Sequence, residues 1–210
     1  MKLVPNRVYH IYNRGNNRQK IFFEPENYYY FLKKVKAYLA PNCDIINYCL
    51  MPNHFHFLIK ANKRSVLPHK FSKEPSARRK DRHPKRLTQF SWGLKQLLSS
   101  YTKGINKRYG RTGSVFQQNT RCKQTSSDFL MDDYSLWCFI YIHNNPKMAG
   151  LVNSPEEYEF SSFKDYLGLR NDSCCNVELG MELLCLDKTD LFECKCEEVP
   201  TVVLKSISKY

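Results

Sequence analysis

The sequence predicts an α+β fold, namely a ferredoxin-like split β-α-β antiparallel sheet with packed helices, including a C-terminal tyrosine-bearing helix. Two observations support this prediction. Some short segments alternate apolar and polar residues as strands do, whereas others place apolar residues three to four positions apart as helices do. These segments follow one another in the order β-α-β-β-α-β-α, which is the order of a split β-α-β fold.

The first half of the chain supplies a strand, a helix and a hairpin. Gly15 lies in a polar loop after the first strand, and Pro41 ends the helix. A turn at 51–53 joins the two strands of the hairpin. The predicted elements are a strand at 8–12, a loop at 13–18, a helix at 26–39 and strands at 45–50 and 54–60.

The second half supplies a helix, a strand and a second helix. Helical spacing predicts the first helix over 88–107, and a strand is expected over 114–123. Another helix begins at Asp128 and halts by Pro146 and Gly150. We assign residues 1–170 to one domain and residues 171–210 to an acidic C-terminal extension.

A basic, proline-interrupted insertion is expected over 61–87. Between residues 68 and 86, eight Lys or Arg residues stand against two acidic ones. Such a segment is typical of a mobile loop that follows a nucleic-acid backbone, and equally of a solvated insertion with no defined role.

The net charge of the whole chain indicates a polyanionic partner. There are 33 Lys or Arg residues against 20 Asp or Glu, a formal charge of +13, and 14 Tyr and 13 Phe residues. Basic residues bind phosphates, and aromatic rings can stack on unpaired bases. The alternative is a solvated basic surface above an aromatic core.

The cysteine pattern and the hydropathy favour a cytoplasmic protein. The nine cysteines include no C-x-x-C pair, which fits reduced thiols better than a disulfide framework. No apolar run approaches the roughly 20 residues of a membrane-spanning helix, so no membrane partner is expected.

Two histidines share one face of a predicted strand. Side chains of a strand alternate between faces, so His54 and His56 project from one face and Phe55 and Phe57 project from the other. Two imidazoles on one face can bind a single divalent cation. The alternative is a half-buried strand whose solvated face carries histidine.

A second pair of chemical groups lies on the helix after the last strand. Tyr141 and Asn145 are four residues apart, so both project from one helical face, where a nucleophile and a ligand could share a site. Without other signals, a tyrosine is more often a packing residue, and residues 144–146 are equally typical of a helix end.

Taken together, these segments resemble the HUH single-tyrosine transposases, in particular the REP-associated tyrosine transposases and the small transposases of insertion sequences. The resemblance spans roughly residues 5–168. It rests chiefly on Tyr-His-Ile-Tyr-Asn-Arg-Gly-Asn at 9–16, Met-Pro-Asn-His-Phe-His-Phe at 51–57 and Tyr-Ile-His-Asn-Asn-Pro-Lys-Met-Ala-Gly at 141–150.

The resemblance implies a function for each of these groups. It implies that His54, His56 and Asn145 bind Mg²⁺ or Mn²⁺ and that Tyr141 is the nucleophile. The enzyme would cleave and rejoin single-stranded or hairpin DNA through a 5′-phosphotyrosine intermediate, on targets with hairpins or palindromic repeats. Two alternatives stay open, a catalytically silent module that binds single-stranded nucleic acid and a metal-dependent nuclease that uses water. A homodimer is a further expectation.

Candidate DNA contacts lie in the first loop and on the last strand. The loop at 13–18 offers backbone amides and cationic side chains that could hold phosphate oxygens. The strand at 114–123 adds two more cations. The candidates are Arg14, Asn16, Arg18, Arg121 and Lys123.

Overall fold

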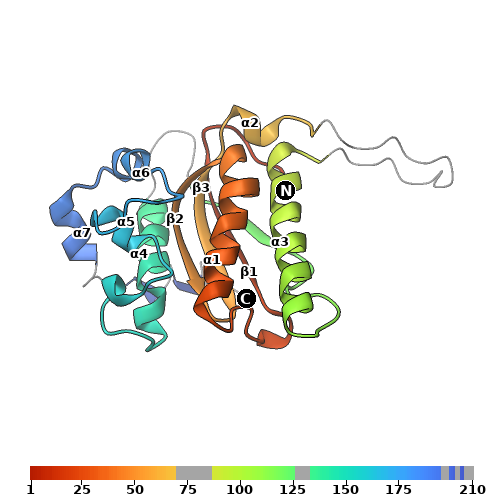
Figure 1. Cartoon of the computed structure of the whole chain (residues 1–210). Helices are drawn as coiled ribbons and strands as arrows, with labels where there is room; N and C mark the ends of the chain where they lie inside the picture. The colour runs from red at the N-terminus through yellow and green to blue at the C-terminus, as the bar shows by residue number, and fades with distance from the viewer. Residues whose placement is uncertain (70–86, 126–132, 195–198, 202–203, 206–210) are drawn as a thin grey trace.

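The computed structural model describes residues 1–69, 87–125, 133–194, 199–201 and 204–205 (Figure 1). Its strands are β1 (Val8–Arg14), β2 (Asp44–Met51), β3 (His54–Lys60) and β4 (Arg121–Gln124). Its α-helices are α1 (Pro25–Lys34), α2 (Lys63–Val66), α3 (Gln89–Arg108), α4 (Asp133–Met148), α5 (Phe163–Tyr166), α6 (Val177–Leu184) and α7 (Lys188–Cys194). Short 3-10 turns lie at Asn16–Arg18, Ala40–Asn42 and Pro155–Glu157, and a π-helical turn at Val35–Leu39 extends α1.

The strands form one sheet in the order β2-β3-β1-β4, and every neighbouring pair is antiparallel. This order, with α1 connecting β1 to β2 and α3 connecting β3 to β4, is that of the predicted ferredoxin-like split β-α-β fold, which is therefore confirmed. In the register, Tyr12 lies opposite His56, and Arg14 lies opposite His54.

Helices cover both faces of this sheet (Figure 1). On one face, Ile11, Phe55 and Phe57 pack with apolar residues of α1 and α3 in a buried core. On the other face, Leu58 packs in a second core with α4 and with residues of α5, α6 and α7. We call this second side the histidine face, because His10 of β1 and His54 and His56 of β3 lie on it by the period-two alternation.

Two predicted segments differ from the structure. The strand predicted over 114–123 is wrong for its first part, since only Arg121–Gln124 is a strand. The Asn13 side chain donates hydrogen bonds to Gln117 O and Thr120 Oγ1 and so holds the preceding residues in an irregular path. Within the loop predicted over 61–87, Asn62 and Ser65 form a capping box that starts the short helix α2, while 70–86 lie outside the described residues.

The last predicted helix is present as α4, which continues through Pro146 to Met148. The predicted start of that helix, Asp128, falls among residues that the structure does not describe. Beyond it, the acidic extension contributes Leu184, Leu191 and Val199 to the core that α4 shares with the sheet. The domain boundary at residue 170 stays a prediction.

Among the described residues, no helix combines the length and the apolar character that crossing a membrane requires.

Candidate active site

β3 brings its two histidines together on the histidine face. The ring centroids of His54 and His56 lie 4.9 Å apart with their planes nearly perpendicular. His56 is completely buried, whereas His54 is partly exposed. Phe55 and Phe57 enter the opposite core, as the alternation predicts. One face of β3 therefore packs in the core, and the other face presents two imidazoles.

His54 makes two side-chain hydrogen bonds that fix its ring. Its Nδ1 atom lies 2.6 Å from Oδ1 of Asn53, and its side chain also hydrogen-bonds to Asn145 of α4. Burial lowers the pKa of His54 to about 4, the hydrogen bond to Asn145 opposes this, and the charge of Arg14 adds to the lowering. The imidazole is thus neutral at pH 7 and can donate a lone pair to a metal ion.

A third histidine, His10 of β1, supports His56. His10 Nε2 lies 2.8 Å from His56 Nδ1, and both rings are fully buried. Burial lowers the pKa of His10 to about 3, helped by the charge of Lys123, and burial also holds the pKa of His56 well below its usual value. Both imidazoles are therefore neutral, so a single N–H lies between the two nitrogens.

α4 places Tyr141 beside these histidines. The ring centroids of Tyr141 and His56 are 5.5 Å apart in an edge-to-face arrangement, and Tyr141 is 5% exposed. Asn145 lies one helical turn further along and reaches His54. The structure therefore brings together four residues singled out from the sequence: His54, His56, Tyr141 and Asn145.

Polar contacts fix α4 on the sheet. Asn47 of β2 donates to the backbone oxygen of Phe139 at 3.1 Å. His143 Nε2 lies 2.8 Å from Ser162 Oγ, and Asn144 donates to Cys194 O at 2.8 Å. These bonds lie on either side of Tyr141 and directly before Asn145 in the sequence, so they help to hold both side chains near the histidines.

The donor set of this site fits a divalent ion such as Mn²⁺ or Mg²⁺. Within the described ranges there is no group of three His, Cys, Asp or Glu residues suited to a metal, so the candidate set depends on the amide oxygen of Asn145 as its third ligand. Two neutral imidazoles and one amide oxygen suit Mn²⁺ somewhat better than Mg²⁺, which prefers oxygen ligands.

Three of the candidate DNA contacts lie on β1 and β4. Arg14 lies directly opposite His54, and Arg121 lies opposite Tyr12 on the edge strand β4. Lys123 lies opposite His10, and its Nζ donates to Tyr134 Oη at 2.7 Å. All three therefore belong to the histidine face.

The other two candidates lie in the 3-10 turn that follows β1. Gly15 N, just before this turn, donates to Asn53 O at 2.8 Å, which holds the turn beside the β2–β3 connection. The Asn16 side chain donates to Ser114 O, so it holds this turn to the segment before β4. Arg18 is exposed with a left-handed backbone, φ 59°. Because Asn53 directly precedes His54, the bond from Gly15 places this turn next to His54. The Asn16 side chain is already bonded to Ser114 O.

Sequence reasoning missed His10. Its signal was present in the alternation of residues 8–12, which places His10 and Tyr12 on one face of a strand, as it does His54 and His56. The alternation does not reveal how β1 pairs with β3, and this pairing is what brings His10 next to His56.

Comparisons with known proteins agree with the fold. Residues 4–105 match the family described as "Transposase IS200 like". A solved structure of a REP-associated tyrosine transposase bound to a REP hairpin shares the fold, with a TM-score of 0.54 and 16% sequence identity over 84% of this chain and 90% of that chain. No curated protein matches the sequence. Residues 4–105 are therefore similar to the IS200-like transposases, and the chain shares the fold of a REP-associated tyrosine transposase.

Proposed function

We propose that this protein is a transposase that cleaves and rejoins single-stranded or hairpin DNA through a covalent bond to Tyr141. The observation that carries the proposal is the meeting of α4 with β3, where the Tyr141 ring lies 5.5 Å from the His56 ring and Asn145 hydrogen-bonds to His54. A nucleophile beside a set of neutral metal ligands is the arrangement that phosphodiester chemistry requires.

In the proposed reaction, Tyr141 Oη attacks the scissile phosphorus. The new O–P bond forms as the bond from phosphorus to the 3′ oxygen breaks, and the phenol proton is transferred overall to that oxygen. The 5′ end of the downstream strand stays on Tyr141 as a phosphodiester. Because the number of phosphodiester bonds is conserved, a 3′ hydroxyl can reverse the step and join strands.

The ligands for a divalent ion would be His54, His56 and Asn145. When bound, Mg²⁺ or Mn²⁺ would supply Lewis-acid stabilisation of the charge that develops on the phosphate oxygens. Arg14, opposite His54, adds a fixed positive charge at the same place. The low pKa of His54 supports this assignment, because the ring needs no deprotonation before it binds metal.

Hairpin DNA is the substrate class that we propose. The similar REP-associated transposase was solved with a REP hairpin, and the charge of +13 here favours a polyanion. Arg14, Arg18, Arg121 and Lys123 are the proposed phosphate contacts, with Asn16 holding the turn that carries Arg18. A homodimer is compatible with this proposal and is not required by it.

A labelling experiment tests the proposal. A hairpin oligonucleotide with single-stranded flanks, labelled at its 3′ end, is incubated with the protein and Mn²⁺ or Mg²⁺ and then denatured. We expect a labelled protein band that EDTA abolishes. Labelled fragments without a protein band would indicate a nuclease that uses water, and binding without cleavage would indicate a silent binding module.

A further inference from the structure

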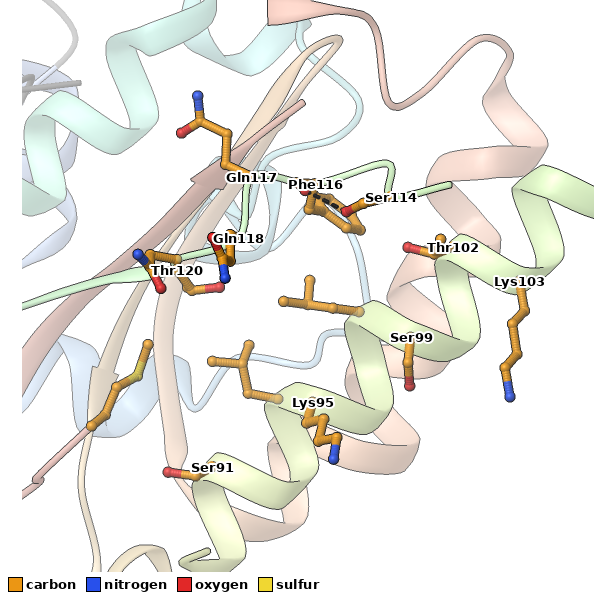
Figure 2. A pocket seen from close by; sticks show the side chains of 14 residues that line it. Ser91, Lys95, Ser99, Thr102, Lys103, Ser114, Phe116, Gln117, Gln118 and Thr120 are labelled. Carbon is orange, nitrogen blue, oxygen red and sulfur yellow. Dashed lines mark hydrogen bonds between the residues drawn. The ribbon is translucent and has the colours of Figure 1, made fainter. Parts of the chain in front are cut away.

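Three thiols line one hollow beside the edge strand β2. This hollow has a volume of about 500 Å³ and lies between residues 40–45 and residues 173–178, and Cys43, Cys174 and Cys175 all line it. The hollow between α3 and residues 114–120 has a different character. Figure 2 shows hydroxyl, amide and lysine side chains around it, and none of the described residues that line it is a cysteine. We call the first of the two the thiol hollow.

Two of these thiols, Cys174 and Cys175, are in contact with each other. They are adjacent in the chain, both are half-buried, and their side chains are hydrogen-bonded. Burial raises the pKa of Cys175 well above its usual value, and the hydrogen bond to Cys174 adds to this. Cys174 also lines a neighbouring hollow of about 410 Å³. A small oxidant therefore reaches Cys174 first, and Cys175 is the more protected thiol.

Hydrogen bonds hold the segment that carries this pair. Ser173 Oγ accepts from Cys175 N at 2.9 Å and donates to Asp165 Oδ2 at 2.6 Å. After the pair, Asn176 N donates to Ile45 O of β2 at 2.8 Å. The two thiols are therefore held side by side before any reaction, and this proximity favours a bond between them.

Cys175 is connected to α4 through Ser162. The Ser162 hydroxyl is hydrogen-bonded to Cys175 and lies 2.8 Å from His143 Nε2 of α4. The same hydroxyl accepts from Tyr48 N at 2.8 Å. His143 is two residues from Tyr141 in the helix. A displacement of Cys175 therefore acts on a contact that holds α4 on the sheet.

A cysteine can also be a small packing residue, and other thiols of this chain fit that role. Cys49 and Cys138 are fully buried in the core of the histidine face. Cys174 and Cys175 differ from them, because they are half-buried, line a hollow and contact each other. The pair therefore has the access and the proximity that thiol oxidation requires.

We propose that Cys174 and Cys175 form a site of reversible oxidation by hydrogen peroxide, and that closing their disulfide disturbs the contact of Ser162 with α4. The S–S bond is about 2.05 Å long, which is well inside a hydrogen-bond distance, so Cys175 Sγ must move relative to Ser162 when the bond forms. The oxidation does not depend on the proposed function, whereas its effect on activity does.

The proposed oxidation has two steps. Cys174 Sγ attacks one oxygen of the peroxide, the O–O bond breaks, and Cys174 sulfenic acid and one water are formed. Cys175 Sγ then attacks Cys174 Sγ, and the sulfenic oxygen leaves as a second water with the thiol proton. The two thiols together lose two electrons, and the peroxide gains them. A reduced dithiol such as dithiothreitol reverses the change.

The spacing of the pair suits a bond that opens again. The peptide bond between the two residues is trans, so their Cα atoms lie about 3.8 Å apart. This is below the range of about 4.4 to 6.8 Å that most disulfides span, so the closed ring is strained. Strained disulfides are readily reduced and are typical of switches.

Peptide mapping tests the oxidation. Full-length protein in EDTA is treated with hydrogen peroxide, then with catalase, and is alkylated and digested with trypsin. Residues 171–188 should be released as one peptide that contains Cys174, Cys175 and Cys185. We expect fragmentation to show a loss of two hydrogen atoms at residues 174–175, reversed by dithiothreitol, with Cys185 alkylated. A bond from Cys174 to Cys43, or oxidation of Cys185 alone, overturns the assignment.

Nuclear magnetic resonance tests the link to α4 without DNA. The ring signal of His143, identified by its loss in His143→Phe, should change its chemical shift on oxidation and recover in dithiothreitol. Cys174→Ser, with Cys174→Ala as a second variant, should be insensitive to peroxide, because Cys175 then has no partner. Cys185→Ser is the matched control and should respond as the wild type does. An unchanged His143 signal in disulfide-bonded protein overturns the link.

The covalent assay separates this inference from the proposed function. Oxidised wild-type protein, freed of peroxide before Mn²⁺ is added, should form the Tyr141 adduct about 10- to 100-fold more slowly, because a displacement of about 1 Å costs about 100-fold. Equal rates in reduced and disulfide-bonded protein would overturn the effect on activity. A disulfide and a shifted His143 signal in a protein that forms no adduct even when reduced would overturn the proposed function and keep the oxidation site.

Discussion

His10 Nε2 and His56 Nδ1 lie 2.8 Å apart in the buried interior of the histidine face. Asn53 Oδ1 lies 2.6 Å from Nδ1 of His54 in the same way. In both candidate ligands the Nδ1 atom is therefore engaged by a protein partner, and this favours Nε2 as the nitrogen that would bind a metal ion. Partners of this type fix the ring orientation and tautomer of histidine ligands.

We predict that His10→Phe weakens Mn²⁺ binding by about 10- to 100-fold, the usual cost of losing a partner of a ligating histidine. With metal bound, His56 Nδ1 must donate to His10 Nε2, and phenylalanine has no acceptor. His10→Gln, whose amide oxygen can accept, should retain more of the affinity. Isothermal titration of DNA-free protein measures the dissociation constants.

Cys49→Ala is the control for this substitution. Cys49 lies opposite His56 on the other flanking strand and is also fully buried, but it is a thiol beside the ring and not an imidazole partner. Equal Mn²⁺ affinity in His10→Phe and in the wild type would show that His10 is only a packing residue.

The side-chain oxygen of Asn145 should contribute to metal binding. We predict that Asn145→Ala weakens Mn²⁺ binding and that Asn145→Asp strengthens it, because a carboxylate adds a negative charge. Asn144→Ala is the matched control, since Asn144 is as buried and bonds to Cys194 O instead. A loss of affinity that is the same in Asn144→Ala and Asn145→Ala would mean that only the position of α4 matters.

The buried histidines should make the metal-free protein less stable in acid. Burial lowers the pKa of His54 to about 4, and that of His10 and His143 to about 3, from 6.5. The unfolded chain therefore binds more protons below pH 6.5, and the free energy of unfolding should fall as pH decreases from about 6.5 toward 4.

Each such group contributes a slope of at most about 1.4 kcal/mol per pH unit. Urea unfolding at several pH values in EDTA measures the combined slope, and His143→Phe should make it shallower by removing one group. A free energy of unfolding that is constant between pH 7 and pH 5 would contradict neutral burial of these histidines.

Much of the candidate site could be predicted from the sequence, because each pair of residues lies on a single strand or helix. The period-two alternation placed His54 and His56 on one face, and the four-residue spacing placed Tyr141 and Asn145 on one side of α4. The sheet order also followed from the order of elements along the chain.

Long-range contacts account for what the sequence did not reveal. His10 lies beside His56 only because β1 pairs with β3 in one register. Residues 114–120 have strand-like composition, but Asn13, about a hundred residues earlier, bonds to Gln117 and Thr120 and replaces the ladder. Neither contact produces a periodic pattern in β1 or in residues 114–120.

Mass spectrometry of the DNA–protein adduct tests the central claim most directly. Trypsin should release residues 124–147 as one peptide that contains both Tyr134 and Tyr141, so fragmentation must locate the attached nucleotide. We predict that it lies on Tyr141, that Tyr141→Phe forms no adduct while still binding DNA, and that Tyr134→Phe forms it. An adduct on Tyr134, or one that persists in Tyr141→Phe, would contradict the account.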